Sequence, residues 1–127
     1  MKLPLSKFIN FVHPSVYIAP SSKMGIGNVF CSQVIINNNT TIGNFNTFNG
    51  NCLFGHDSFI GDHNILAASC TVSSEVKIGN GNFLGINSSI LDGVRIDDYN
   101  ILGMSSTLLN NVDSRKKLVG TPARIIK

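Results

Sequence analysis

The sequence predicts an all-β protein, a parallel β-solenoid of about six coils, because a six-residue repeat and an eighteen-residue repeat are superimposed along most of its 127 residues. From Val12 the chain divides into seventeen consecutive hexapeptides without an insertion, and the first residue of each is large and apolar. A helical stripe with a period of 3.6 residues would lose this phase. The first residues are Val12, Ile18, Met24, Phe30, Ile36, Ile42, Phe48, Phe54, Ile60, Leu66, Val72, Ile78, Leu84, Ile90, Ile96, Leu102 and Leu108.

The eighteen-residue period groups three hexapeptides into one coil of a three-sided prism. Coils stack about 4.8 Å apart, the spacing of neighbouring strands, so residues eighteen apart lie over one another. Stacked asparagines can then form an amide ladder, and we expect Asn and Gly to supply the positive φ angles of the corners. We expect a lead-in at 1–11, coils at 12–113 and a tail at 114–127. The repeated residues are Asn28, Asn46, Asn64, Asn82 and Asn100, with Gly25, Gly43, Gly61 and Gly79.

Composition and charge exclude several classes of protein. Only 13% of the residues are charged but 43% are hydrophobic, so the chain is not disordered. It contains no apolar run long enough to span a membrane and no export signal, so we expect a cytoplasmic protein. Five of the ten basic residues lie in 115–127 and none lies in 25–75, a pattern that does not fit a nucleic-acid-binding surface. The basic tail suits a small phosphorylated ligand instead.

One face of the prism is predicted to bind further copies of the chain as a homotrimer. Large apolar residues beside very small ones form a flat surface of the kind that a partner subunit covers. A second face carries Lys23, Thr41, Lys77 and Arg95 instead. The outward pairs of the apolar face are Val29/Cys31, Thr47/Asn49, Ile65/Ala67, Phe83/Gly85 and Ile101/Gly103.

His56, in the segment FGHDSF, is the candidate for chemistry. Phe54 and Ser58 take the core positions on either side, so His56 should project from a corner, and Asp57 follows it. An imidazole beside a carboxylate has a fixed tautomer and raised basicity, as a general base near pH 7 requires. A surface His–Asp pair without a catalytic role is the alternative interpretation.

Two other mechanisms have less support from the residues. Cys31, Cys52 and Cys70 lack CxxC spacing, and Cys52 and Cys70 share an inward column as small core residues. Gamma-type carbonic anhydrases hold zinc with three histidines on a solenoid of this kind. Here His13 lies more than two coils from His56, and His63 lies on another corner, so we expect no metal.

From His13 to Arg124 the sequence resembles the hexapeptide-repeat bacterial sugar acetyltransferases of the sialic acid and bacillosamine type. The stretches that carry the resemblance are FVHPS, GHDSFIGD, VKIGNGNFLGINSSIL, DDYNILGMSSTLLNNV and VGTPARI. The resemblance implies a left-handed β-helix, although the crossover rule alone favours a right-handed one. It also implies a homotrimer that uses acetyl-CoA.

The resemblance implies roles for single residues. His56 corresponds to the general base and Asp57 to the carboxylate that orients it. Asn49 and Ile65 correspond to positions near the reacting centre, and Ile65 stands where the relatives have a second histidine. The positions implied for acetyl-CoA, in a groove between subunits, are Ser74, Gly85, Ile86, Gly103, Met104 and Arg124, and the relatives have glycine in place of Ser74 and Met104.

The relatives also carry an N-terminal domain that holds a nucleotide sugar, whereas about eleven residues precede the first coil here. The acceptor would then be bound by the coils and the trimer cleft, or by another polypeptide, or the chain is a fragment. We expect transfer of an acetyl group from acetyl-CoA to an amino or hydroxyl group of a sugar or sugar nucleotide, by direct attack. The alternative is a non-catalytic β-helical scaffold or binding module.

Overall fold

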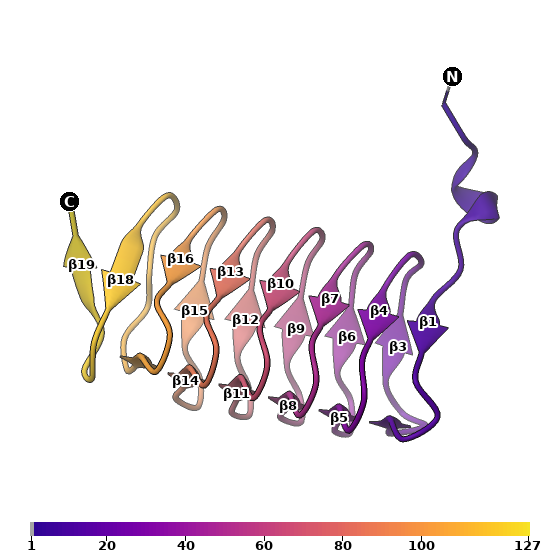
Figure 1. Ribbon diagram of the computed structural model, residues 1–127, viewed down its shortest axis with the longest axis horizontal. Coiled ribbons are helices and arrows are strands. Elements are labelled where there is room, and N and C mark those ends of the chain that lie inside the picture. Colours follow the sequence, from indigo (N-terminus) through magenta and orange to yellow (C-terminus); the bar gives the residue numbers. More distant parts are fainter. Residues whose placement is uncertain (1) are drawn as a thin grey trace.

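The computed structural model describes residues 2–127 and shows a three-sided β-solenoid of about six coils (Figure 1). The predicted fold class is therefore confirmed. The strands of the coils are only two residues long, and the chain turns a corner after each one. The N-terminus and the C-terminus lie at opposite ends of the stack (Figure 1).

Strands stack into three sheets, one for each side of the prism, which we call sheets A, B and C. Sheet A contains β1 (Phe11–Val12), β4 (Val29–Phe30), β7 (Thr47–Phe48), β10 (Ile65–Leu66), β13 (Phe83–Leu84), β16 (Ile101–Leu102), β18 (Lys117–Val119) and β19 (Arg124–Ile126). Sheet B contains β2 (Tyr17–Ile18), β5 (Ile35–Ile36), β8 (Leu53–Phe54), β11 (Thr71–Val72), β14 (Ser89–Ile90) and β17 (Thr107–Leu108). Sheet C contains β3 (Lys23–Met24), β6 (Thr41–Ile42), β9 (Phe59–Ile60), β12 (Lys77–Ile78) and β15 (Arg95–Ile96).

The pairing register follows the eighteen-residue period and builds the core. Phe30 pairs with Phe48, and their rings stack with centroids 4.9 Å apart and planes 11° apart. From Phe30 onward the first residue of each hexapeptide is buried. Val12, which is 42% exposed, and its counterparts Ile18 and Met24 are not fully buried, because they form the first coil and pack against other coils on one side only.

The predicted asparagine ladder is present and begins one coil earlier than expected, at Asn10. Asn28 donates from its backbone N–H to Asn10 Oδ1 over 2.9 Å. Asn64 donates from Nδ2 to Asn46 Oδ1 over 3.0 Å and to the carbonyl of Gly79 over 2.9 Å. At the other end, Asn100 Nδ2 is buried without a hydrogen-bond partner among residues 2–127. Each internal asparagine thus joins three successive coils.

The residues that take positive φ at the corners are not the ones expected. From Gly27 to Ser105 the fourth residue of every hexapeptide is left-handed, whatever its type, and Phe45 with a φ of 56° is an example. The recurring glycines are the second residues, and their φ is not positive. A Cβ on Gly61 would lie 2.4 Å from Asn80 Oδ1, because Asn80 reaches back one coil to bond the N–H of Asp62. These glycines are needed for space and not for backbone conformation.

The C-terminal tail extends the solenoid. β18 pairs with β16 in parallel, and β19 folds back on β18 as an antiparallel strand. At the other end the short 3-10 helix η1 (Leu5–Lys7) lies in the lead-in. Over the described range, 2–127, no helix has the length and apolar character needed to cross a membrane.

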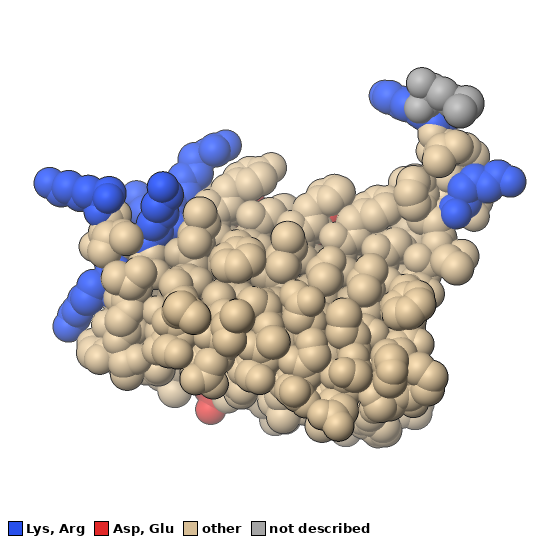
Figure 2. Space-filling view, viewed as in Figure 1, with Lys and Arg blue, Asp and Glu red and all other residues tan. Residues whose placement is uncertain are grey.

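The outer face of sheet A is apolar, as the sequence indicates. Ile65, Phe83 and Ile101 are each between 42% and 45% exposed. Figure 2 views this side of the molecule: Lys and Arg side chains gather at the two ends, and the middle carries none. The face has the character expected of a trimer contact, and the trimer itself remains a prediction.

Candidate active site

His56 and Asp57 project from the edge between sheets B and C, which we call the B–C edge. The loop of residues 55–58 joins β8 to β9, and Asp57 takes the left-handed conformation with a φ of 55°. His56 Nδ1 lies 2.7 Å from Asp57 Oδ2. Because the carboxylate can only accept, this hydrogen bond assigns the proton to Nδ1 and leaves Nε2 of the neutral ring unprotonated. Both side chains are about half exposed, at 54% and 51%.

The coils on either side hold this loop in place. The N–H of Asp57 donates to the carbonyl of Asn38 over 2.9 Å, and the carbonyl of His56 accepts from the N–H of Glu75 over 2.9 Å. Ser58 is buried, and its hydroxyl oxygen accepts from the N–H of Val76 over 3.1 Å. The imidazole therefore stands on a fixed backbone, as a catalytic group must.

The electrostatics of the pair favour an ionised carboxylate. Hydrogen bonding from His56, and then from the Asn39 side chain, lowers the pKa of Asp57 below its ordinary value. Asp57 is therefore charged throughout the neutral range and keeps its hydrogen bond to Nδ1. It would also stabilise the imidazolium that forms when Nε2 accepts a proton.

A second carboxylate, Asp92, stands close to this pair and was not predicted from the sequence. Asp92 reaches back one coil, so that its Oδ1 accepts from the backbone N–H of Ser74 over 2.9 Å and from the hydroxyl of Ser73. These two bonds lower the pKa of Asp92, with a smaller contribution from the charge of nearby His56. The N–H of Ser74, a predicted acetyl-CoA contact, is thus already occupied within the chain.

The bonds to Asp92 predict a pH dependence of stability. Because the pKa of Asp92 is lower in the folded chain than its ordinary value of 3.8, its contribution to stability is fully present above that value and is lost as pH falls through the lower, folded-state pKa. Asp92→Asn should lower Tm at pH 7 and lower it less at pH 3. Thermal unfolding of both proteins at the two pH values tests this, and an equal loss of Tm at both would contradict it.

The other predicted site residues lie elsewhere on the prism. Asn49, Gly85, Ile86, Gly103 and Met104 lie on the edge between sheets A and B, which we call the A–B edge. Ile65 points outward from sheet A, and Arg124 lies in β19, where it and Lys116 line a pocket of about 260 Å³. One chain therefore gathers most of the residues predicted for acetyl-CoA, but places them on a different edge from His56.

The A–B edge has free hydrogen-bond donors at the third position of two hexapeptides, whereas Ser74 at the matching position of the B–C edge is bonded. In residues 2–127, the backbone N–H groups of Ile86 and Met104 donate to no acceptor, whereas the equivalent N–H of Ser74 is bonded to Asp92. A Cβ on Gly85 would lie 2.6 Å from the backbone nitrogen of Met104, so glycine is required for these coils to stack. Exposed N–H groups beside Ile86 and Met104, which are 49% and 68% exposed, suit a ligand with amide and carbonyl groups.

The remaining histidines and cysteines do not join the site. His13 contacts Ser15 Oγ over 2.8 Å on the A–B edge, and the His63 ring stacks on Phe45 on the edge between sheets C and A, with centroids 5.4 Å apart. No group of three His, Cys, Asp or Glu residues within 2–127 could hold a metal ion. Burial raises the pKa of the Cys52 thiol to about 11 and that of Cys70 to about 12, so neither is a thiolate nucleophile at neutral pH.

Comparison with known proteins finds no matching family model and no matching curated protein. Among solved structures, a histidine-to-asparagine mutant of perosamine N-acetyltransferase from Caulobacter crescentus, in complex with CoA and GDP-perosamine, superposes with a TM-score of 0.93 at 26% identity. The match covers 94% of this chain and 57% of that one, so the chain spans little more than half the length of that protein.

Two further solved structures extend the likeness. The acetyltransferase domain of PglB from Neisseria gonorrhoeae, in complex with acetyl coenzyme A, gives a TM-score of 0.91 at 16% identity, with 94% and 58% of the two chains covered. The UDP-N-acetylglucosamine O-acyltransferase LpxA from Moraxella catarrhalis gives a TM-score of 0.63 at 21% identity, with 91% and 73% covered.

Proposed function

Starting from the left-handed hexapeptide-repeat β-helix fold that this chain shares with those acetyltransferase domains, we propose that it transfers an acetyl group from acetyl-CoA to an amino or hydroxyl group of a sugar or sugar nucleotide. The observation that carries the proposal is the His56–Asp57 pair, 2.7 Å apart on an exposed edge, with Nε2 free to accept a proton. The fold alone hosts many functions, so the chemistry rests on this site.

The reaction is a direct transfer with His56 as general base. The acceptor nitrogen or oxygen attacks the thioester carbonyl while its proton passes to His56 Nε2, and Asp57 stabilises the resulting imidazolium. The tetrahedral intermediate then collapses, the carbon–sulfur bond breaks, and the imidazolium returns the proton to the CoA thiolate. No acyl-enzyme forms, and the buried, protonated thiols of Cys52 and Cys70 support that assignment.

The geometry supports a site shared between two copies of the chain. His56 lies on the B–C edge, whereas the free N–H groups of Ile86 and Met104 lie on the A–B edge. To form such a site, a homotrimer would have to pack the apolar sheet A face of one chain, which borders its A–B edge, against the B–C edge of its neighbour, the edge that sheet A does not border. Arg124 and Lys116 would then attract the phosphates of CoA at the C-terminal end.

A second candidate is a non-catalytic binding module, and one observation favours it. Asp92 holds the Ser74 N–H, so a donor next to His56 cannot stabilise an oxyanion while that bond persists. The two functions are separated by measuring thiol release from acetyl-CoA with a panel of amino sugars, neutral sugars and sugar nucleotides. Turnover that depends on the acceptor supports the enzyme, and binding of sugars without thiol release supports the module.

A further inference from the structure

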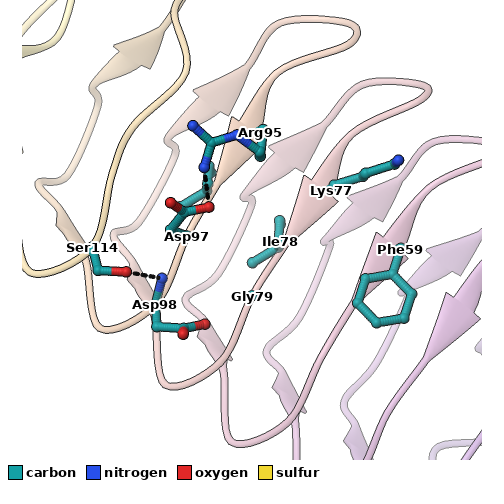
Figure 3. A pocket seen from close by; sticks show the side chains of 9 residues that line it. Phe59, Lys77, Ile78, Gly79, Arg95, Asp97, Asp98 and Ser114 are labelled. Atoms are coloured by element: carbon teal, nitrogen blue, oxygen red, sulfur yellow. Dashed lines mark hydrogen bonds and ion pairs between the residues drawn. The ribbon is translucent and has the colours of Figure 1, made fainter.

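A shallow trough of about 330 Å³ lies on the outer face of sheet C and extends to the edge between sheets C and A (Figure 3). Phe59 is its closest residue to the candidate base, because it follows His56 by three positions and begins the next strand. Phe59 pairs with Lys77, and Lys77 pairs with Arg95, so the three side chains form one outward column across neighbouring strands. Phe59 therefore marks the end of the trough that follows the His56 loop, and Gly79, Asp97 and Asp98 mark the end at the edge between sheets C and A.

Gly79 lines the trough at the corner that follows β12. Gly79 lies between Phe59 and the acidic end of the trough in Figure 3. A Cβ on Gly79 would lie 2.2 Å from Asp98 Oδ1, so the fold itself keeps this position empty of a side chain. The trough is consequently open at Gly79, with the Phe59 ring and the cations of sheet C along its other side, so a ring-shaped ligand could lie in it.

Of the two cationic side chains that line the trough in the described part of the chain, only Lys77 is free to bind a ligand. Within residues 11–114 the Lys and Arg residues are Lys23, Lys77 and Arg95, and all three stand in the outward column of sheet C. Arg95 is committed to Asp97 and to Asp113, the latter over 3.3 Å. Lys77 belongs to no ion pair within 2–127, so its ammonium is free to bind an anion beside Phe59.

Hydrogen-bonding groups complete the trough at its far end. The Ser114 hydroxyl oxygen accepts from the N–H of Asp98 over 2.9 Å, which leaves the hydroxyl hydrogen available to a ligand. Phe59 is 45% exposed, and the negative face of its ring attracts the polarised C–H groups of a sugar ring. An aromatic face, a free ammonium and hydroxyl-binding groups together fit a phosphorylated sugar.

We propose that this trough is a subsite for a sugar that carries a phosphate, with the sugar ring against Phe59 and the phosphate at Lys77. The inference rests on the proposed function, because a sugar ring held against Phe59 would lie at the end of the trough nearest to His56, which precedes Phe59 by three residues. It adds a surface of this chain's own coils that recognises the acceptor. The phosphate can belong to a sugar 1-phosphate or to a nucleotide sugar, and the experiment separates these sources.

Direct binding tests the subsite without turnover. The 1-phosphates of glucosamine, galactosamine and mannosamine, the three free amino sugars and the corresponding UDP-sugars would be titrated into the wild-type protein by calorimetry. We expect at least one 1-phosphate to bind about tenfold or more tightly than its free sugar, as a charge-assisted hydrogen bond implies. Lys77→Ala should abolish this difference in affinity, and Phe59→Ala should weaken the binding of both the 1-phosphate and its free sugar. A UDP-sugar that binds more tightly than the 1-phosphate identifies the nucleotide form.

Lys23→Ala is the matched control, because Lys23 stands in the same column but outside the trough. Equal weakening by Lys23→Ala and Lys77→Ala, or wild-type protein that binds none of the phosphates, would overturn the subsite. Binding that depends on Lys77 without any thiol release would leave the subsite standing and reject the proposed function. Thiol release with an acceptor KM that neither Phe59→Ala nor Lys77→Ala changes would support the proposed function and reject the subsite.

Discussion

His56→Ala should lower kcat for thiol release from acetyl-CoA by about 10²–10⁴-fold, the usual contribution of a general base. The reason is geometric: Asp57 holds Nδ1 at 2.7 Å, so Nε2 is the atom left to take the acceptor's proton. The change removes an exposed side chain, and the carbonyl of residue 56 still accepts from Glu75, so the fold should be unaffected. The measurement is steady-state turnover with a saturating acceptor.

Two further variants make this test specific. His63→Ala removes a histidine from another edge of the prism and should leave kcat within about twofold of wild type, since His63 stacks on Phe45 away from the proposed site. Asp57→Asn should lower kcat by less than His56→Ala does, because the imidazole remains but loses its orienting charge. Wild-type turnover in His56→Ala would remove the base from the mechanism.

Asn64→Leu should lower the free energy of unfolding by roughly 1–3 kcal/mol, because it leaves the buried N–H of Asn82 without a partner. Asn64 Nδ2 donates to the carbonyl of Gly79 over 2.9 Å, and Asn64 Oδ1 accepts from the N–H of Asn82 over 2.8 Å. Leucine has a similar size but can make neither bond. Urea denaturation followed by circular dichroism measures the change.

Asn110→Leu is the control for the ladder, because Asn110 is exposed on the B–C edge. It should change the free energy of unfolding by less than about 0.5 kcal/mol, as surface substitutions usually do. If Asn64→Leu cost no more than this control, the ladder would not be a source of stability.

The fold was predictable because the hexapeptide register is unbroken, and that register assigns each apolar first residue to the interior. The sequence did not show which corner residue takes positive φ, since the fourth positions include Phe45, Glu75 and Tyr99, types that rarely adopt it. The asparagine ladder was predictable as a pattern. The apolar first positions begin at Val12, so they do not indicate that the ladder starts one coil earlier, at Asn10.

The candidate site was predictable only in part. The His56–Asp57 contact followed from adjacency at a corner, and the structure confirms the pair. Asp92 could have been found by counting, because it lies eighteen residues after Ser74 and so stands over it in the next coil. The same counting places Ile86 and Met104 on a different edge from His56. How the edges of separate chains meet depends on the assembly, which neither the sequence nor a single chain contains.

Mixing two inactive variants tests the shared site most directly. His56→Ala lacks the base. Met104→Asp places a negative charge that repels CoA on the A–B edge, and because Met104 is 68% exposed the change should not disturb the core. If each site uses one chain's His56 and another chain's Met104, refolding the two variants together at equal amounts should restore about a quarter of wild-type turnover, because random trimers form an intact pair at that frequency. Activity that stays at the level of the separate variants would contradict the account.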